Sequence, residues 1–133
     1  MSRLAGKVAV VTGAGRGMGR VIVNISHGLA KFPLAGSSVY SATKTAIQTF
    51  TESWAKELGP KGVTVNTVIP GATSPGMMDD APAGYREFFV KASPFGRIGR
   101  ADEIAAVVAF SARPKPAGCP ALIFSPTAQP IPD

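Results

Sequence analysis

The stretch that decides the fold runs from Lys7 to Gly19 and reads KVAVVTGAGRGMG. Residues Lys7 to Val11 form a β-rich, mainly apolar run, which predicts a buried strand that passes into a glycine-rich turn. Because glycine has no Cβ atom, the backbone N–H groups of such a turn can approach a pyrophosphate closely. The spacing Gly13-x-x-x-Gly17-x-Gly19 differs from the G-x-G-x-x-G dinucleotide motif, so an ordinary tight turn is the alternative interpretation.

Two further strands are predicted downstream of this turn. The β-branched run Val21 to Ile25 favours a strand, although its apolar residues, together with Met18 and Leu29, also have the spacing of one helix face. Alternating apolar residues predict another buried strand from Val63 to Ile69, which ends at Pro70-Gly71. Strands that follow a glycine-rich turn in this way indicate an α/β chain.

A long helix is predicted from Val39 to Leu58, with Gly59-Pro60 as its stop signal. Tyr40 and Lys44 lie four residues apart on it and therefore share one face. An ammonium held near a phenol favours the phenolate and lowers the pKa of the tyrosine, which makes it a better acid and base near neutral pH. By itself the pair also fits an ordinary exposed helix face. The expected buried stripe of this helix consists of Ile47, Phe50, Trp54 and Leu58.

The C-terminal part of the chain contains shorter elements. After a loop rich in Gly, Pro and Ser, an amphipathic segment from Tyr85 to Lys91 has the character of a lid over a cleft. A last helix is predicted from about Asp102 to Ala112, and Ala121 to Phe124 could form a short strand. The expected buried residues of the last helix are Ile104, Val107 and Val108.

Three motifs in this order closely resemble the short-chain dehydrogenase/reductase family. Thr12 to Gly19 matches its TGxxxGxG turn, Tyr40 to Lys44 its YxxxK motif, and Asn66 to Gly71 its strand-ending N-x-x-x-P-G. The similarity continues through Ser93 to Arg97 and the helix start at Asp102 to Ala105. The resemblance implies an α/β fold with a Rossmann-like, doubly wound parallel sheet, and an NAD(P)-dependent interconversion of a carbonyl and an alcohol.

The resemblance also implies roles for single residues. Tyr40 would donate or take the proton, Lys44 would bind the nicotinamide ribose and lower the pKa of Tyr40, and the Pro70 to Thr73 turn would hold the nicotinamide carboxamide. Arg16 favours NADP(H), because an arginine there can reach a 2′-phosphate with charge-assisted hydrogen bonds; NAD(H) stays open. No metal ligand is expected. The implied cofactor-binding residues are Gly13, Arg16, Gly17, Met18, Gly19, Lys44, Pro70, Gly71 and Thr73.

The chain lacks a large internal block of the family. Between Arg20 and Val21 the family has its second, third and fourth strands, with the residues that meet the adenine and its ribose, and after the last helix it has a closing strand. The expected sheet is therefore incomplete. Because the missing fourth strand separates the first and fifth strands in the family, the sheet must close a gap or leave unpaired edges.

The catalytic serine of the family is displaced as well. It lies thirteen residues before the tyrosine, a position that His27 occupies here, while Ser26 lies one residue earlier. We take Ser26 as the candidate for polarising the carbonyl, although His27 could donate a hydrogen bond instead, and both could be ordinary loop residues.

Length and composition limit the domain organisation, the partners and the localisation that we expect. The 133 residues, 45% of them hydrophobic, favour one domain over residues 1–113, followed by a Pro-rich and poorly ordered tail over 114–133. The net charge is +6, but the basic residues are scattered, so we expect no nucleic-acid partner. With a lone Cys119, no targeting signal and no apolar stretch of membrane length, we expect a cytoplasmic protein without a membrane partner.

Three hypotheses about the whole chain remain at this stage. The first is an oxidoreductase that acts on a small carbonyl or alcohol, in a homo-oligomer as the family implies. The second is a non-catalytic dinucleotide-binding or subunit-association module, which joins relatives through the Tyr40 helix. The third is the product of an internal deletion with no function of its own.

Overall fold

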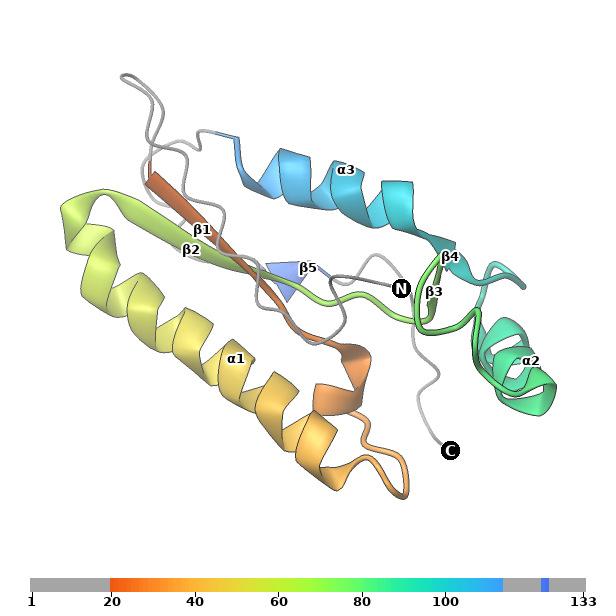
Figure 1. Cartoon of the computed structure of the whole chain (residues 1–133). Coiled ribbons are helices and arrows are strands. Elements are labelled where there is room, and N and C mark those ends of the chain that lie inside the picture. The colour runs from red at the N-terminus through yellow and green to blue at the C-terminus, as the bar shows by residue number, and fades with distance from the viewer. Residues whose placement is uncertain (1–19, 114–122, 125–133) are drawn as a thin grey trace.

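The computed structural model describes residues 20–113 and 123–124 (Figure 1). The strand predicted at Lys7 to Val11 and the glycine-rich turn that follows it lie outside these residues. The strands are β1 (Arg20–Ile25), β2 (Val63–Val68), β3 (Thr73–Ser74), β4 (Gly99–Arg100) and β5 (Ile123–Phe124); the α-helices are α1 (Ser38–Leu58), α2 (Ala83–Ala92) and α3 (Ala101–Ser111); and the 3-10 helices are η1 (Gly28–Ala30) and η2 (Gly59–Lys61).

The main sheet is parallel and has the strand order β1-β2-β5. β1 pairs with β2 along its whole length, from Arg20 opposite Val63 to Ile25 opposite Val68. β5 adds two residue pairs on the other side of β2. The strands predicted at 21–25 and 63–69 are confirmed, and the helical alternative for the first of them is wrong, because β-branched residues pack well in a pleated sheet.

Helices cover both faces of this sheet, with α1 on one side and α3 on the other (Figure 1). The two-residue period of the strands explains this arrangement, because alternate side chains point to opposite faces. Val21, Val23 and Val68 form one buried cluster, against which Ile104, Val107 and Val108 of α3 pack. The second cluster consists of Ala55, Val63 and Val65, packed against Ile22 and Leu58. The predicted buried face of the last helix is thereby confirmed.

The predicted buried stripe of α1 is wrong for Phe50 and Trp54, while Ile47 and Leu58 are half-buried. Phe50 and Trp54 are 51% and 36% exposed, and their rings stack on the outer surface at a centroid distance of 5.6 Å. The fully buried residues of the helix are instead Ser41, Thr51 and Ala55. Small side chains let the helix approach the sheet closely, and the hydroxyl of Thr51 finds partners there.

Thr51 is the centre of a buried hydrogen-bond network between α1 and the sheet. Its hydroxyl donates to the carbonyl of Ile47 (2.9 Å) and accepts from Asn24 Nδ2 of β1 (2.9 Å) and Thr67 Oγ1 of β2 (2.6 Å). Asn24, Thr51 and Thr67 are each no more than 1% exposed. This network fixes the position of α1 along β1 and β2, and thereby the position of every side chain at the start of the helix.

A short second sheet anchors the lid segment. β3 and β4 pair in parallel, and the N–H of Gly99 donates to the carbonyl of Ala72 (3.0 Å). The chain between them forms α2, which covers the predicted amphipathic segment at 85–91. The possible strand at 121–124 is confirmed at Ile123–Phe124, the two described residues of that stretch, which pair with Thr67 and Val68.

In the stretches 20–113 and 123–124, no helix combines the length and the apolar character that a membrane crossing requires.

Candidate active site

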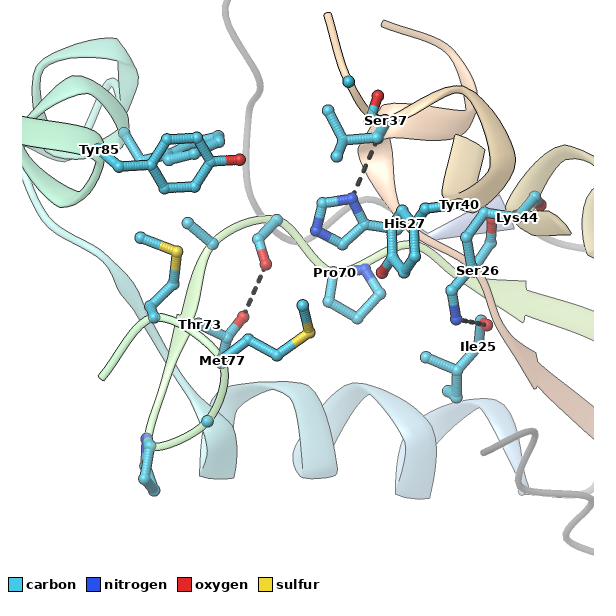
Figure 2. Close-up of a pocket in the computed structure, with 18 residues that line it drawn as sticks. Ile25, Ser26, His27, Ser37, Tyr40, Lys44, Pro70, Thr73, Met77 and Tyr85 are labelled. Atoms are coloured by element: carbon cyan, nitrogen blue, oxygen red, sulfur yellow. Dashed lines mark hydrogen bonds between the residues drawn. The ribbon is translucent and has the colours of Figure 1, made fainter. Parts of the chain in front are cut away.

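A cavity of about 540 Å³ lies where β1 and β2 end. Ligands in open parallel sheets bind at this carboxyl edge. Four segments line the cavity: the end of β1, the first turns of α1, the turn after β2, and α2 (Figure 2). Its lining includes Ser26, His27, Tyr40, Lys44, Pro70, Gly71, Thr73, Met78, Tyr85 and Phe89.

Tyr40 and Lys44 face this cavity from the first turns of α1. Lys44 Nζ lies 5.6 Å from the centre of the Tyr40 ring and donates to the carbonyl of Ile25 at 3.2 Å. The lysine thus sits over the face of the phenol, and its ammonium is held by the end of β1. Burial lowers the pKa of Lys44 from its ordinary value.

The expected lowering of the Tyr40 pKa is not found in this arrangement. Burial raises the pKa of Tyr40, and the Tyr85 phenol across the cavity raises it further. The physical reason lies in the position of the ammonium, which is over the Tyr40 ring and engaged by the Ile25 carbonyl. Desolvation of the phenolate is therefore the main effect on the pKa of Tyr40.

Ser26 lines the cavity but is tied to the helix behind it. Its hydroxyl donates to the carbonyl of Lys44 (2.8 Å) and accepts from Gln48 Nε2 (3.0 Å). The residue is 2% exposed, and its N–H donates to the carbonyl of Val68. Since a hydroxyl has one proton to donate, this serine joins β1 to α1 in the described structure.

His27 directly precedes η1, in the segment that connects β1 to α1. Its Nδ1 accepts a hydrogen bond from the N–H of Leu29 (3.1 Å), and its ring meets the Tyr40 ring edge to face at 5.5 Å. Burial, with a smaller contribution from the charge of Lys44, lowers the pKa of His27 to about 4. The imidazole is therefore neutral at pH 7.

The turn after β2 forms the floor of the cavity. Pro70, Gly71 and Thr73 all line it, and Thr73 Oγ1 donates to the carbonyl of Gly71 (2.9 Å). The structure thus brings together six of the predicted site residues from three parts of the chain. The remaining ones, Gly13, Arg16, Gly17, Met18 and Gly19, lie outside the described residues.

The sequence did not predict that α2 and the loop before it form a wall of the cavity. Tyr85 and Phe89 of α2 line the cavity together with Met77 and Met78 of the preceding loop, and Tyr85 and Phe89 contact each other edge to face at 4.9 Å. The amphipathic pattern at 85–91 indicated a lid. It did not show which of its side chains point into the cavity.

Comparison with known proteins identifies the family. The family model described as "Enoyl-(Acyl carrier protein) reductase" matches residues 3–120. The chain is 44% identical over 91 residues to an uncharacterized oxidoreductase, YjdA, of Bacillus subtilis, and 36% identical over 104 residues to the 3-oxoacyl-[acyl-carrier-protein] reductase FabG of Pseudomonas aeruginosa. It belongs to the short-chain dehydrogenase/reductase family, as its three motifs predicted.

Solved structures agree with this assignment. The reductase LugOII of lugdunomycin biosynthesis superimposes with a TM-score of 0.70 at 36% identity, over 81% of this chain and 43% of that one. A short-chain dehydrogenase of Burkholderia cenocepacia in complex with NADP superimposes with a TM-score of 0.68 at 34% identity, over 82% of this chain and 44% of that one. The predicted incomplete Rossmann-like fold is confirmed.

The chain is short in comparison with these relatives. The matches cover 68% of it but 35% of YjdA, and 78% of it but 42% of the Pseudomonas reductase. The chain thus spans well under half the length of the curated relatives that it matches.

Proposed function

We propose that the chain is an NAD(P)(H)-dependent oxidoreductase that interconverts a carbonyl and an alcohol, with Tyr40 as the acid and base. The observation that carries this proposal is the meeting of Tyr40, Lys44 and the Pro70 to Thr73 turn around one cavity at the carboxyl edge of the sheet. Tyr40 and Lys44 belong to one motif and the Pro70 to Thr73 turn to another part of the chain, and only folding brings the two together.

The donors and acceptors of the cavity fit the nicotinamide half of the cofactor. A lysine ammonium has three N–H donors, and Lys44 uses one of them on the Ile25 carbonyl, so two remain to hold ribose hydroxyls. The backbone of Pro70 to Thr73 would face the carboxamide. The bound nicotinamide supplies or accepts a hydride. NADP(H) is favoured by Arg16 and by the NADP complex of the Burkholderia relative.

Proton transfer falls to Tyr40 in this mechanism. In the reducing direction its hydroxyl gives a proton to the carbonyl oxygen as a hydride reaches the carbonyl carbon, and the alcohol leaves. The phenol must be protonated for this step, and burial, which raises its pKa, keeps it so at neutral pH. The positive charge of Lys44, 5.6 Å from the centre of the ring, stabilises the phenolate that remains until a proton returns from water.

A titration with NADPH and NADH tests the first half of the proposal. A ligand that binds only the folded chain raises its unfolding temperature, so we expect saturable stabilisation, larger with NADPH. Arg16→Ala should reduce the NADPH effect and leave the NADH effect. No shift with either nucleotide would contradict the proposal.

Turnover tests the second half. Ethyl acetoacetate, a 3-oxo ester, is a suitable first substrate because the Pseudomonas relative is named as a 3-oxoacyl reductase. In the described residues no hydrogen bond joins the Tyr40 hydroxyl to another group, so Tyr40→Phe should fold normally. We expect it to lower kcat by at least about 100-fold; a Tyr40→Phe chain as active as the unaltered one would rule out the acid and base role.

One observation favours a second candidate, a subunit-association module without turnover. The exposed stack of Phe50 and Trp54 on α1 offers an apolar surface to a second protein chain. Nucleotide binding without turnover, together with a defined oligomer that Trp54→Gln dissociates, would select this candidate over the oxidoreductase.

A further inference from the structure

The hydrogen-bond donors around the cavity decide which side chain can assist Tyr40. A carbonyl oxygen that gains negative charge in the transition state is stabilised by preorganised N–H or O–H donors besides the acid itself. In the chain sequence the serine of the family is replaced by two adjacent candidates, Ser26 and His27. Their hydrogen bonds separate them.

Ser26 has no proton left for a substrate. Its Oγ–H is directed to the Lys44 carbonyl at 2.8 Å, and Gln48 Nε2 donates to the same oxygen at 3.0 Å. To reach a substrate, the hydroxyl would have to give up its bond to the Lys44 carbonyl while Gln48 still donates to the same oxygen. The side chain is 2% exposed and acts as a link between strand and helix.

His27 has the opposite arrangement. Because Nδ1 accepts from the N–H of Leu29, it carries no proton, and the neutral ring carries its single proton on Nε2. In Figure 2 this second nitrogen lies on the side of the ring that faces the cavity, away from α1. Among the described residues no hydrogen-bond partner meets it. The burial that keeps the ring neutral also keeps it from competing with Tyr40 as an acid.

The ring also lies at a suitable place relative to Tyr40. The two rings are in edge contact, with centroids 5.5 Å apart and planes at 72°, and both line the cavity. A carbonyl oxygen in front of the Tyr40 hydroxyl therefore lies within reach of the imidazole edge. The backbone bond to Leu29 and the contact with Tyr40 hold the ring in this orientation before any substrate arrives.

We propose that His27 Nε2–H is the second donor to the substrate carbonyl oxygen, in the role that a serine has in the family. The inference rests on the oxidoreductase function proposed above. His27 keeps its proton throughout: the proton that forms the alcohol comes from Tyr40, and the hydride comes from the reduced nicotinamide, which is oxidised. His27 stabilises only the developing negative charge on oxygen.

The first experiment compares kinetic constants for NADPH-dependent reduction of ethyl acetoacetate. His27→Asn keeps an acceptor for the Leu29 N–H, because asparagine is a good N-cap residue, but removes the Nε2–H donor. We expect kcat to fall by about 100-fold, with KM changed less than threefold and the unfolding midpoint retained. His27→Gln, whose amide N–H can reach further, should retain more activity than His27→Asn; equal losses would overturn the donor role.

Ser26→Ala and Tyr40→Phe make the outcomes distinguishable. A larger loss of kcat in Ser26→Ala than in His27→Asn assigns the role to the serine and overturns the inference. Full activity of His27→Asn beside an inactive Tyr40→Phe also overturns it, while the oxidoreductase function stands. No turnover by the unaltered chain overturns both proposals.

A second measurement does not depend on turnover. His27 is the only histidine of the chain, so the ring nitrogen signals in a ¹⁵N-labelled sample belong to it alone. We expect the Nε2–H tautomer at pH 7, and a shift of the Nε2 signal when ethyl acetoacetate is added with NADP⁺. A ring protonated on Nδ1, or an Nε2 signal that does not move although ethyl acetoacetate with NADP⁺ raises the unfolding temperature, would contradict the inference.

Discussion

The two helical walls of the cavity are held in different ways. On the α1 side the supporting residues are buried and polar: Asn24, Ser26 and Thr51 are no more than 2% exposed and bond across strand and helix. On the α2 side Tyr85 and Phe88 are 42% and 49% exposed and contact Phe89 of their own helix.

This difference separates two tasks of a binding site. The α1 wall fixes the groups proposed to handle the proton, because the bonds of Thr51 to Asn24 and Thr67 behind it are buried and costly to break. The α2 wall presents aromatic surface that fewer contacts hold, chiefly Arg86, which bonds to the Met78 carbonyl (3.3 Å) and lies 3.8 Å from the Asp79 carboxylate. Under the proposed function, such a wall would adapt to different substrates without moving Tyr40.

The largest effect should come from the network behind the α1 wall. Thr51→Val has nearly the same shape, but it deprives Asn24 and Thr67 of their buried partner. We expect the free energy of unfolding to fall by about 3 kcal/mol, since each buried group left unsatisfied costs about 1–3 kcal/mol. Urea unfolding measures this change. Thr49→Val, on the exposed face of the same helix, is the matched control, and an equal loss in both variants would refute the network's importance.

A smaller effect should appear in acid and again concerns the α1 wall. The pKa of His27 is about 4 in the folded chain and 6.5 ordinarily, so the unfolded chain takes up the proton first as the pH falls. Stability due to this residue is complete above pH 6.5 and is lost toward pH 4, by about 3 kcal/mol. Urea unfolding at several pH values, compared between the unaltered chain and His27→Asn, isolates this contribution from the carboxylates. Parallel pH curves would show that the imidazole is not buried as described.

The smallest effect should come from the α2 wall. Tyr85 raises the pKa of Tyr40, so Tyr85→Phe should lower that pKa and move the alkaline limb of the kcat/KM profile to lower pH. We expect KM to change only a few-fold, because the side chain is partly exposed and its wall is adaptable. Phe88→Leu, on the same helix but not part of the cavity lining, should leave the profile in place. A large fall of kcat in Tyr85→Phe would mean that α2 also takes part in the chemistry.

Much of the fold and of the candidate site could be predicted from the sequence. The strands at 21–25 and 63–69 and the helices around Tyr40 and Ile104 were found from residue period and stop signals. Tyr40, Lys44 and Pro70 were found because their motifs have fixed spacing within one element or turn. The lid at 85–91 was located, but its inward side chains were not, since an amphipathic segment alone does not show what it faces.

The sequence by itself determined the family, the element order and the motif residues, because these depend on local spacing along the chain. Only the tertiary structure decided which face of α1 is buried, since hydrogen bonds of Thr51 to two strands outweigh the apolar stripe of Phe50 and Trp54. It also decided the hydrogen bonding of the two adjacent candidates for the second donor. Ser26 is bonded to α1, and the protonated nitrogen of His27 faces the cavity. Both outcomes depend on groups distant in sequence, whose partners no local pattern specifies.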